Sequence, residues 1–250
     1  MNNHTKLPAI TLSFWIMKIC ATTLGETAGD LLSMTLKIGY AISSLLLLSF
    51  FFVTLFIQLF SKKHHPTIYW SVILATSTAG TTISDFMDRT LGLGYAMGSI
   101  LLATLLVITL AIWKISEKTL AVTNIKSARG ELFYWTAILF SNTLGTALGD
   151  FLADNSGLGF AGGAILIGSL LVLIVLAYQF SRISHIFLFW LAFVLTRPFG
   201  ATFGDLLTKP IEKGGLNFGT IGSSTLLFGI LVILIVISMA SEKKPIKSSS

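Results

Sequence analysis

Four aspartates recur at regular places in this chain, each fifteen residues after a tryptophan. The pairs are Trp15 and Asp30, Trp70 and Asp85, Trp135 and Asp150, and Trp190 and Asp205. A carboxylate within a hydrophobic segment is costly in a bilayer, so it usually serves a purpose there. Hard cations prefer oxygen ligands, and rings of carboxylates select cations in pores. The four aspartates are therefore the first candidates for a cation site and for metal ligands.

Threonines on the helical face of each aspartate extend the candidate site. Residues three, four or seven positions apart lie on one face of an α-helix. The threonines are Thr23 and Thr27 beside Asp30, Thr78 and Thr82 beside Asp85, Thr143 beside Asp150, and Thr202 beside Asp205. The pattern is imperfect, because Thr146 is shifted by one position and Pro198 replaces a threonine in the fourth copy. We expect these hydroxyls to supplement the carboxylates in binding substrate.

Glu26 and Arg197 make the four copies unequal. Glu26 lies four residues before Asp30 and has no acidic counterpart in the other copies. Arg197 takes the position that is held by Thr22, Ser77 and Asn142 elsewhere. Glu26, Asn142 and Arg197 join the candidate substrate-binding residues, and Arg197 is expected to pair with a carboxylate from a neighbouring helix. If it points into a central axis, an anionic substrate or a proton-coupled step becomes an alternative to simple cation conduction.

Lys18 is a second basic residue within an apolar segment, and it lies twelve residues before Asp30. That separation corresponds to about 18 Å along an ideal helix, so direct pairing with Asp30 is not expected.

The wider pattern is a fourfold internal repeat. Each copy carries a glycine ten residues after its tryptophan and an aromatic residue before it, which gives W-x9-G-x4-D. We place the repeats at residues 14–63, 69–118, 134–183 and 189–244. Each contains two long apolar stretches with a short connection, which predicts four helical hairpins.

Composition indicates an integral membrane protein. Hydrophobic residues make up 54% of the chain and charged residues 11%, whereas about a quarter of the residues of a typical soluble domain are charged. Crossing a bilayer core of about 30 Å takes about 20 apolar residues. Eight spans are predicted, near residues 10–30, 38–60, 68–86, 92–114, 132–150, 157–180, 186–206 and 215–240. The expected fold is a single all-α membrane domain over residues 1–250.

The spacing also predicts how the repeats are arranged. Because each repeat has two spans, all four enter the membrane in the same direction, as parallel repeats about an axis along the membrane normal. Close packing of the first helices is expected from pairs of small residues four positions apart. These pairs are Gly25/Gly29, Gly80/Ser84, Gly145/Gly149 and Gly200/Gly204. A pseudo-fourfold arrangement would place the four aspartates at one depth, as a ring.

Orientation follows from the basic residues outside the spans. The side with both termini holds eleven: Lys6, Lys62, Lys63, Lys114, Lys118, Lys126, Arg129, Arg182, Lys243, Lys244 and Lys247. The other side holds four: Lys37, Arg89, Lys209 and Lys213. The positive-inside rule therefore predicts cytoplasmic termini, with residues 241–250 as a disordered tail. The net charge of +6 is explained as a topology signal, so no nucleic-acid partner is expected.

A second motif opens the second span of each repeat. We align Lys37-Ile38-Gly39-Tyr40 with Gly92-Leu93-Gly94-Tyr95, Gly157-Leu158-Gly159-Phe160 and Gly215-Leu216-Asn217-Phe218. An aromatic residue at the membrane boundary after a small residue is typical of a tight re-entry turn. The fourth copy reaches this motif after three extra residues.

Four tandem two-helix units with one regularly placed tryptophan resemble the DUF347 repeat family of bacterial membrane-anchored proteins. The resemblance covers residues 14 to about 240 and rests on W-x9-G-x4-D in all four copies. It implies a bacterial inner-membrane protein and carries no established activity.

The leading functional hypothesis is a transporter or channel for a cation, with a divalent metal as one candidate, through a central ring of aspartates. One alternative is a non-transporting scaffold or interaction protein whose charges lock the helices, and another is a transporter of a small organic or anionic solute. An enzyme is not expected, because the chain has one cysteine, Cys20, and no HExxH or CxxC motif. No cofactor is expected, membrane lipids are the expected surroundings, and the oligomeric state stays open.

Two structural alternatives concern the same residues. Each aspartate could merely end its helix at the membrane interface, or cap a following short helix through its side-chain oxygen. The first helices could also be broken near Gly25, Gly145 or Pro198, since half-helix ends in a membrane can bind ions. The tryptophans are expected to act as interfacial or packing anchors.

Overall fold

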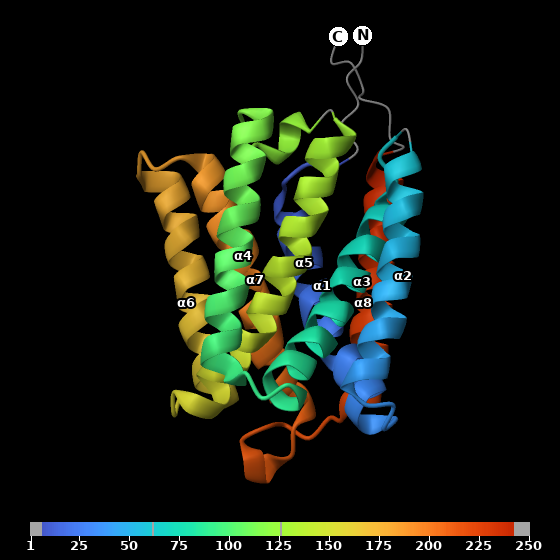
Figure 1. Ribbon diagram of the computed structural model, residues 1–250, viewed down its shortest axis with the longest axis vertical. Helices are drawn as coiled ribbons and strands as arrows, with labels where there is room; N and C mark the ends of the chain where they lie inside the picture. The colour runs from blue at the N-terminus through green and yellow to red at the C-terminus, as the bar shows by residue number, and fades with distance from the viewer. Residues whose placement is uncertain (1–6, 62, 126, 243–250) are drawn as a thin grey trace.

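The fold is a bundle of long α-helices, seen in a computed structural model that describes residues 7–61, 63–125 and 127–242. The helices are α1 (Leu12–Asp30), α2 (Tyr40–Phe60), α3 (Pro66–Asp85), α4 (Gly94–Glu117), α5 (Ala128–Asp150), α6 (Gly159–Phe180), α7 (His185–Thr208) and α8 (Thr220–Glu242). Connections alternate between the two ends of the bundle (Figure 1). No strand occurs in the described ranges. The prediction of an all-helical chain is confirmed, with helix limits within a few residues of the predicted spans.

The odd-numbered helices form the interior of the bundle. Helix α1 contacts α3, α3 contacts α5, α5 contacts α7, and α7 returns to α1. Each even helix packs against the odd helix of the following repeat, as α2 on α3, α4 on α5 and α6 on α7. Helix α8 packs on α1, where the Ser224 hydroxyl donates to Thr27 Oγ1 at 2.9 Å. The last repeat is therefore joined to the first.

The outer surface identifies a membrane protein. Large apolar side chains are exposed along the even helices, including Phe52, Ile100, Val172 and Ile233. Helices α2, α4, α6, α7 and α8 are long and apolar enough to cross a membrane. Helices α1, α3 and α5 are less apolar and have their polar residues buried in the interior. This distribution is expected in lipid, where exposed polar groups are costly.

Glycines allow the odd helices to approach closely, as the small-residue pairs predicted. A Cβ at Gly25 would lie 2.2 Å from Ser77 Oγ, and one at Gly80 would lie 2.9 Å from the Thr143 backbone nitrogen. A Cβ at Gly145 would overlap the Arg197 side chain and lie 3.0 Å from the Arg197 backbone carbon. The fourth copy closes the series, because a Cβ at Gly200 would lie 2.8 Å from the Thr22 backbone carbon. Each glycine thus fixes the register between one repeat and the next.

The odd helices are continuous, so the broken-helix alternative is wrong within the described residues. Helix α7 runs through Pro198 from His185 to Thr208. After α1, α3 and α5, a five-residue π-helical segment follows the aspartate directly, at Leu31–Thr35, Phe86–Thr90 and Phe151–Asn155. Asp30, Asp85 and Asp150 precede these segments but make no side-chain capping bond to them. The capping alternative is therefore also wrong for these three aspartates.

The re-entry turn corrects the alignment of the fourth repeat. In the second and third copies the two glycines of the motif both have positive φ, at 73° and 70° for Gly92 and Gly94. In the fourth copy the positive φ values fall on Asn217 at 57° and Gly219 at 71°. The turn is therefore Asn217 to Thr220, two residues later than predicted. Glycine recurs nine residues after the aspartate in the other copies and fourteen after Asp205, so the insertion is five residues.

The predicted disordered tail falls largely on residues 243–250, which lie outside the described residues, as do Lys6, Lys62 and Lys126 of the charge count.

Candidate functional site

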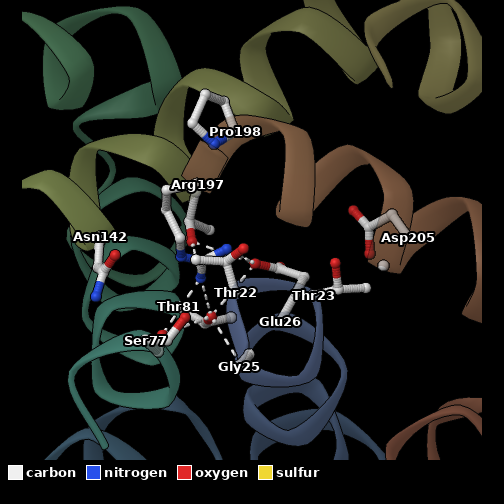
Figure 2. Close-up of polar contacts among 12 residues, drawn as sticks. Thr22, Thr23, Gly25, Glu26, Ser77, Thr81, Asn142, Arg197, Pro198 and Asp205 are labelled. Carbon is white, nitrogen blue, oxygen red and sulfur yellow. Dashed lines mark hydrogen bonds and ion pairs between the residues drawn. The ribbon is translucent and has the colours of Figure 1, made fainter. Parts of the chain in front are cut away.

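At the centre of the bundle lies a buried ion pair between α7 and α1. Arg197 Nη1 is 3.0 Å from Glu26 Oε2, and both side chains are removed from solvent (Figure 2). Arg197 Nη2 donates to the hydroxyls of Thr81 on α3 and Thr146 on α5, at 2.5 and 2.7 Å. Both hydroxyls donate in turn to Glu26 Oε2. The prediction that Arg197 pairs with a carboxylate of a neighbouring helix is confirmed, and all four odd helices meet here.

Repeat positions explain why these residues meet. Glu26, Thr81, Thr146 and Ala201 each lie eleven residues after the tryptophan of their repeat. The equal offset places them at equivalent positions on the four inner helices, and Arg197 reaches across from its own helix. Sequence reasoning overlooked Thr81 and noted Thr146 only as a shifted position outside the candidate set, although this constant offset was a signal that could have found both. The guanidinium nitrogens Nη1 and Nη2 are thus committed to protein groups, and the centre is filled by side chains.

The four aspartates lie one turn further along the same helices, towards the connections within the repeats. They are 2–3% exposed, so none of them is solvated at an interface. Arg89 contacts two of them, with Nε 2.9 Å from Asp85 Oδ1 and Nη2 2.9 Å from Asp150 Oδ2. Lys209 contacts the other two, with Nζ 2.6 Å from Asp30 Oδ2 and 3.0 Å from Asp205 Oδ1. The candidate ring is therefore organised as two pairs, each held by one basic side chain.

Arg89 and Lys209 are functional candidates that the sequence interpretation missed. Both were counted as loop charges, yet each lies four residues after the aspartate of its repeat, a spacing that places opposite charges together on a helix. Met34 and Asp154 take this position in the other two repeats. With Arg89 and Lys209 assigned to the site, Lys37 and Lys213 are the basic residues left on that side.

One of the two pairs has an additional carboxylate. Oxygen atoms of Glu26, Asp30 and Asp205 all lie within 4.8 Å of one another. Three carboxylates face two cations at this place, Arg197 and Lys209, which leaves one formal negative charge. Oxygen ligands at this spacing suit a hard cation. The cluster of Glu26, Asp30 and Asp205 is hereafter called the acidic triad.

The predicted threonines lie on the inner helices, but their hydroxyl hydrogens are committed to the backbone. All six donate to a carbonyl of their own helix: Thr23, Thr27, Thr78, Thr82, Thr143 and Thr202. Thr27 also accepts from Ser224 of α8. Asn142 belongs to a different layer, where its amide donates to Thr76 and its oxygen faces Lys18.

An aromatic layer fills the end of the inner bundle opposite the aspartates. The hydroxyls of Tyr69 and Tyr134 are 2.7 Å apart and buried. Trp70 and Trp135 are buried beside them, and Trp190 Nε1 donates to the Leu120 carbonyl at 3.0 Å. The repeated tryptophans are therefore packing anchors, and Trp15 is the one that is only partly buried.

Removal of the Arg89 charge tests whether this side chain offsets the repulsion between Asp85 and Asp150. Arg89→Gln leaves Asp85 and Asp150 facing one another, so the unfolding midpoint of the detergent-solubilised protein is expected to fall. Asp150→Asn removes one of the repelling charges, so the double variant is expected to recover part of the loss, with a coupling of about 0.5–3 kcal/mol. Additive effects of the two changes would contradict this pairing.

Comparison with known proteins places the chain in a family. A family model described as "Repeat of Unknown Function (DUF347)" matches residues 13–64, 68–119, 133–184 and 188–244. No curated protein and no solved structure matches the chain. The four matches coincide with the four helical hairpins and cover most of the sequence. This chain belongs to the DUF347 repeat family.

Proposed function

We propose that this protein is a transporter of a cation, and that the acidic triad binds it. The observation that carries the proposal is the meeting of three buried carboxylates from α1 and α7 within 4.8 Å. Ionisable residues buried within membrane spans mark substrate and ion pathways, and these three carboxylates outnumber the two cations beside them. Exchange of the single Lys209 charge for a divalent ion would neutralise Asp30 and Asp205 together, so a divalent metal is the favoured substrate class.

A transporter is favoured over an open channel by the filling of the central axis. Arg197, Glu26, Thr81 and Thr146 occupy the middle of the inner bundle, and the aromatic layer fills one end. An ion bound among the aspartates could cross to the other side of the membrane only if these side chains rearranged. Transport of an anion is less favoured, because Arg197 already binds Glu26 and two hydroxyls.

The membrane arrangement completes the proposal. All eight helices would cross the bilayer as four parallel repeats about a pseudo-fourfold axis, with the polar helices α1, α3 and α5 shielded by the even ones. The location would be the bacterial inner membrane with cytoplasmic termini, in contact with lipids. No enzymatic role is included, because the buried groups form ion pairs and helix contacts.

A membrane scaffold is the second candidate. It is favoured by the fact that each of the four aspartates contacts a basic side chain, as expected of groups that lock helices in place. Buried ion pairs can specify an arrangement without adding much stability.

The elemental content of expressing cells tests the proposal. Cells with the wild-type chain should gain or lose one metal relative to cells with an empty vector. A form with Asn at positions 30, 85, 150 and 205, at matched membrane levels, should abolish that change. The paired variants Asp30→Asn/Asp205→Asn and Asp85→Asn/Asp150→Asn provide a matched comparison, and the first pair should have the larger effect. Unchanged metal transport in the fourfold variant would show that the aspartates do not bind the transported ion. Equal metal content in cells with the wild-type chain and cells with the empty vector would favour the scaffold.

A further inference from the structure

The second half of α6 does not bury side chains against the inner helices as α2 and α4 do. Tyr178 lies nineteen residues after the last glycine of its turn motif, as Gln58 and Trp113 do in the first two repeats. Gln58 and Trp113 are both 1% exposed, whereas Tyr178 is 53% exposed and its ring stacks on His185 with centres 4.3 Å apart. Beyond Ile167, no described residue of α6 is buried.

In the first two repeats, this helix position closes the groove between two inner helices. Gln58 on α2, which packs on α3, also donates to Glu131 of α5 at 3.4 Å. The Trp113 ring on α4, which packs on α5, lies 5.6 Å from the Trp190 ring of α7. Tyr178 makes no hydrogen bond or ring contact with α1 within the described chain. The groove between α7 and α1 is therefore left open.

A cavity of about 630 Å³ occupies the groove that α6 leaves open. Its walls come from α1, α6, α7 and residues 120–123, and its volume suits a small-molecule site, which typically has about 300–1,000 Å³. The opening lies on the outer surface, because Leu12, Ile16 and Val175 line the cavity and are 76%, 48% and 61% exposed. That apolar surface faces lipid, so an apolar molecule can enter from the bilayer.

The lining favours a hydrocarbon chain over a polar solute. Thr11 and Thr196 are among the few polar residues of the wall, and their hydroxyls are already engaged. Thr11 accepts from the Phe14 backbone nitrogen, and Thr196 donates to the Phe193 carbonyl at 2.7 Å. A polar solute would lose its hydrogen bonds to water without replacing them, which is costly. Trp15 also lines the cavity, which explains why it is only partly buried.

Basic side chains border the cavity. His185 lines it, and Arg182 is exposed three residues earlier, in the α6–α7 connection. Lys118 is exposed at the end of α4, just before the segment that lines the cavity. No acidic residue occurs in residues 118–123 or 181–188. The α4–α5 and α6–α7 connections lie at the same end of the bundle (Figure 1). Basic pockets between membrane helices bind anionic lipid headgroups.

We propose that this cavity binds one acyl chain of an anionic phospholipid, whose phosphate lies at Arg182, Lys118 and His185. The chain fills the groove that Gln58 and Trp113 close in the first two repeats. The site is separate from the acidic triad and does not depend on the proposed transport. With cytoplasmic termini, it belongs to the cytoplasmic leaflet, where anionic lipids are attracted to basic residues.

Quenching of tryptophan fluorescence tests the chain site on the purified full-length protein in detergent. Phosphatidylglycerol with brominated acyl chains should quench wild type in a saturable manner, because Trp15 lines the cavity. Ala192→Phe places a ring in the cavity and should abolish this saturable quenching. Ala111→Phe, at an exposed position of α4, should leave it unchanged. Equal quenching of Ala192→Phe and wild type would overturn the inference.

The headgroup is tested by substitutions in exposed connections, which leave the packed helices intact. Wild type should bind brominated phosphatidylglycerol more tightly than phosphatidylcholine with the same chains. Arg182→Gln should weaken phosphatidylglycerol binding about fivefold, as expected for one basic side chain at an anionic surface, and should leave phosphatidylcholine binding unchanged. Lys63→Gln, in the exposed α2–α3 connection, should change neither. Equal wild-type affinities for the two lipids, or equal losses in Arg182→Gln and Lys63→Gln, would overturn the inference.

Discussion

Replacement of Arg197 by methionine is expected to destabilise the folded protein by about 3–5 kcal/mol, because Glu26 would remain buried without its counter-charge. The two hydroxyls of Thr81 and Thr146 would also lose their shared donor. The substitution touches all four inner helices at once, since the ion pair joins α1 and α7 and the hydroxyls belong to α3 and α5. Thermal unfolding of the detergent-solubilised protein, followed by size-exclusion chromatography after heating, measures the loss.

The matched control is the double variant Arg197→Met/Glu26→Gln. It removes both charges and leaves neutral groups of similar size, so much of the lost stability should return. A single variant as stable as wild type would show that the pair contributes no stability. Equal losses in the single and double variants would show that the packing of the arginine, rather than its charge, determines the effect.

The fold could be predicted from the sequence because its signals are periodic. Four copies of W-x9-G-x4-D and long apolar stretches determine where helices begin and end, and these limits were confirmed to within a few residues. The turn in the fourth repeat was aligned wrongly because Gly215 resembles the glycine of the motif. The structure shows that Asn217 and Gly219 have the left-handed backbone of this turn. Backbone conformation of this kind cannot be assigned from residue type when an insertion adds further glycines.

The candidate site was predicted in part, and the missing part concerns contacts between helices. The pairing of Arg197 with a carboxylate followed from the cost of a buried charge, but Glu26 could not be singled out without the register between α7 and α1. That register depends on close contacts such as Gly200 against Thr22. Arg89 and Lys209 were overlooked because the connections where they lie were treated as solvated loops. Their four-residue spacing from Asp85 and Asp205 was the available signal.

The register itself can be tested by filling one glycine contact. Gly80→Leu is expected to cost about 1–3 kcal/mol or more, because its Cβ would lie 2.9 Å from the Thr143 nitrogen and 3.0 Å from the Asn142 carbonyl carbon. Both neighbours are backbone atoms of α5, so a side-chain rotation cannot relieve the overlap. Helices α3 and α5 must separate, which should also disturb the contact between Asn142 and Lys18.

Gly229→Leu is the matched control, since no atom lies within 4 Å of a Cβ at that position on α8. Its unfolding midpoint should stay near that of wild type, because substitutions away from packed features usually change stability by about 0.5 kcal/mol or less. If Gly80→Leu and Gly229→Leu unfold at the same temperature, close packing of α3 on α5 does not fix the register of the inner helices. Some other contact would then have to align the helices that carry the acidic triad and the Arg197–Glu26 ion pair. A selective loss in Gly80→Leu would instead show that the glycine of the repeat positions the charged residues, although it carries no side chain.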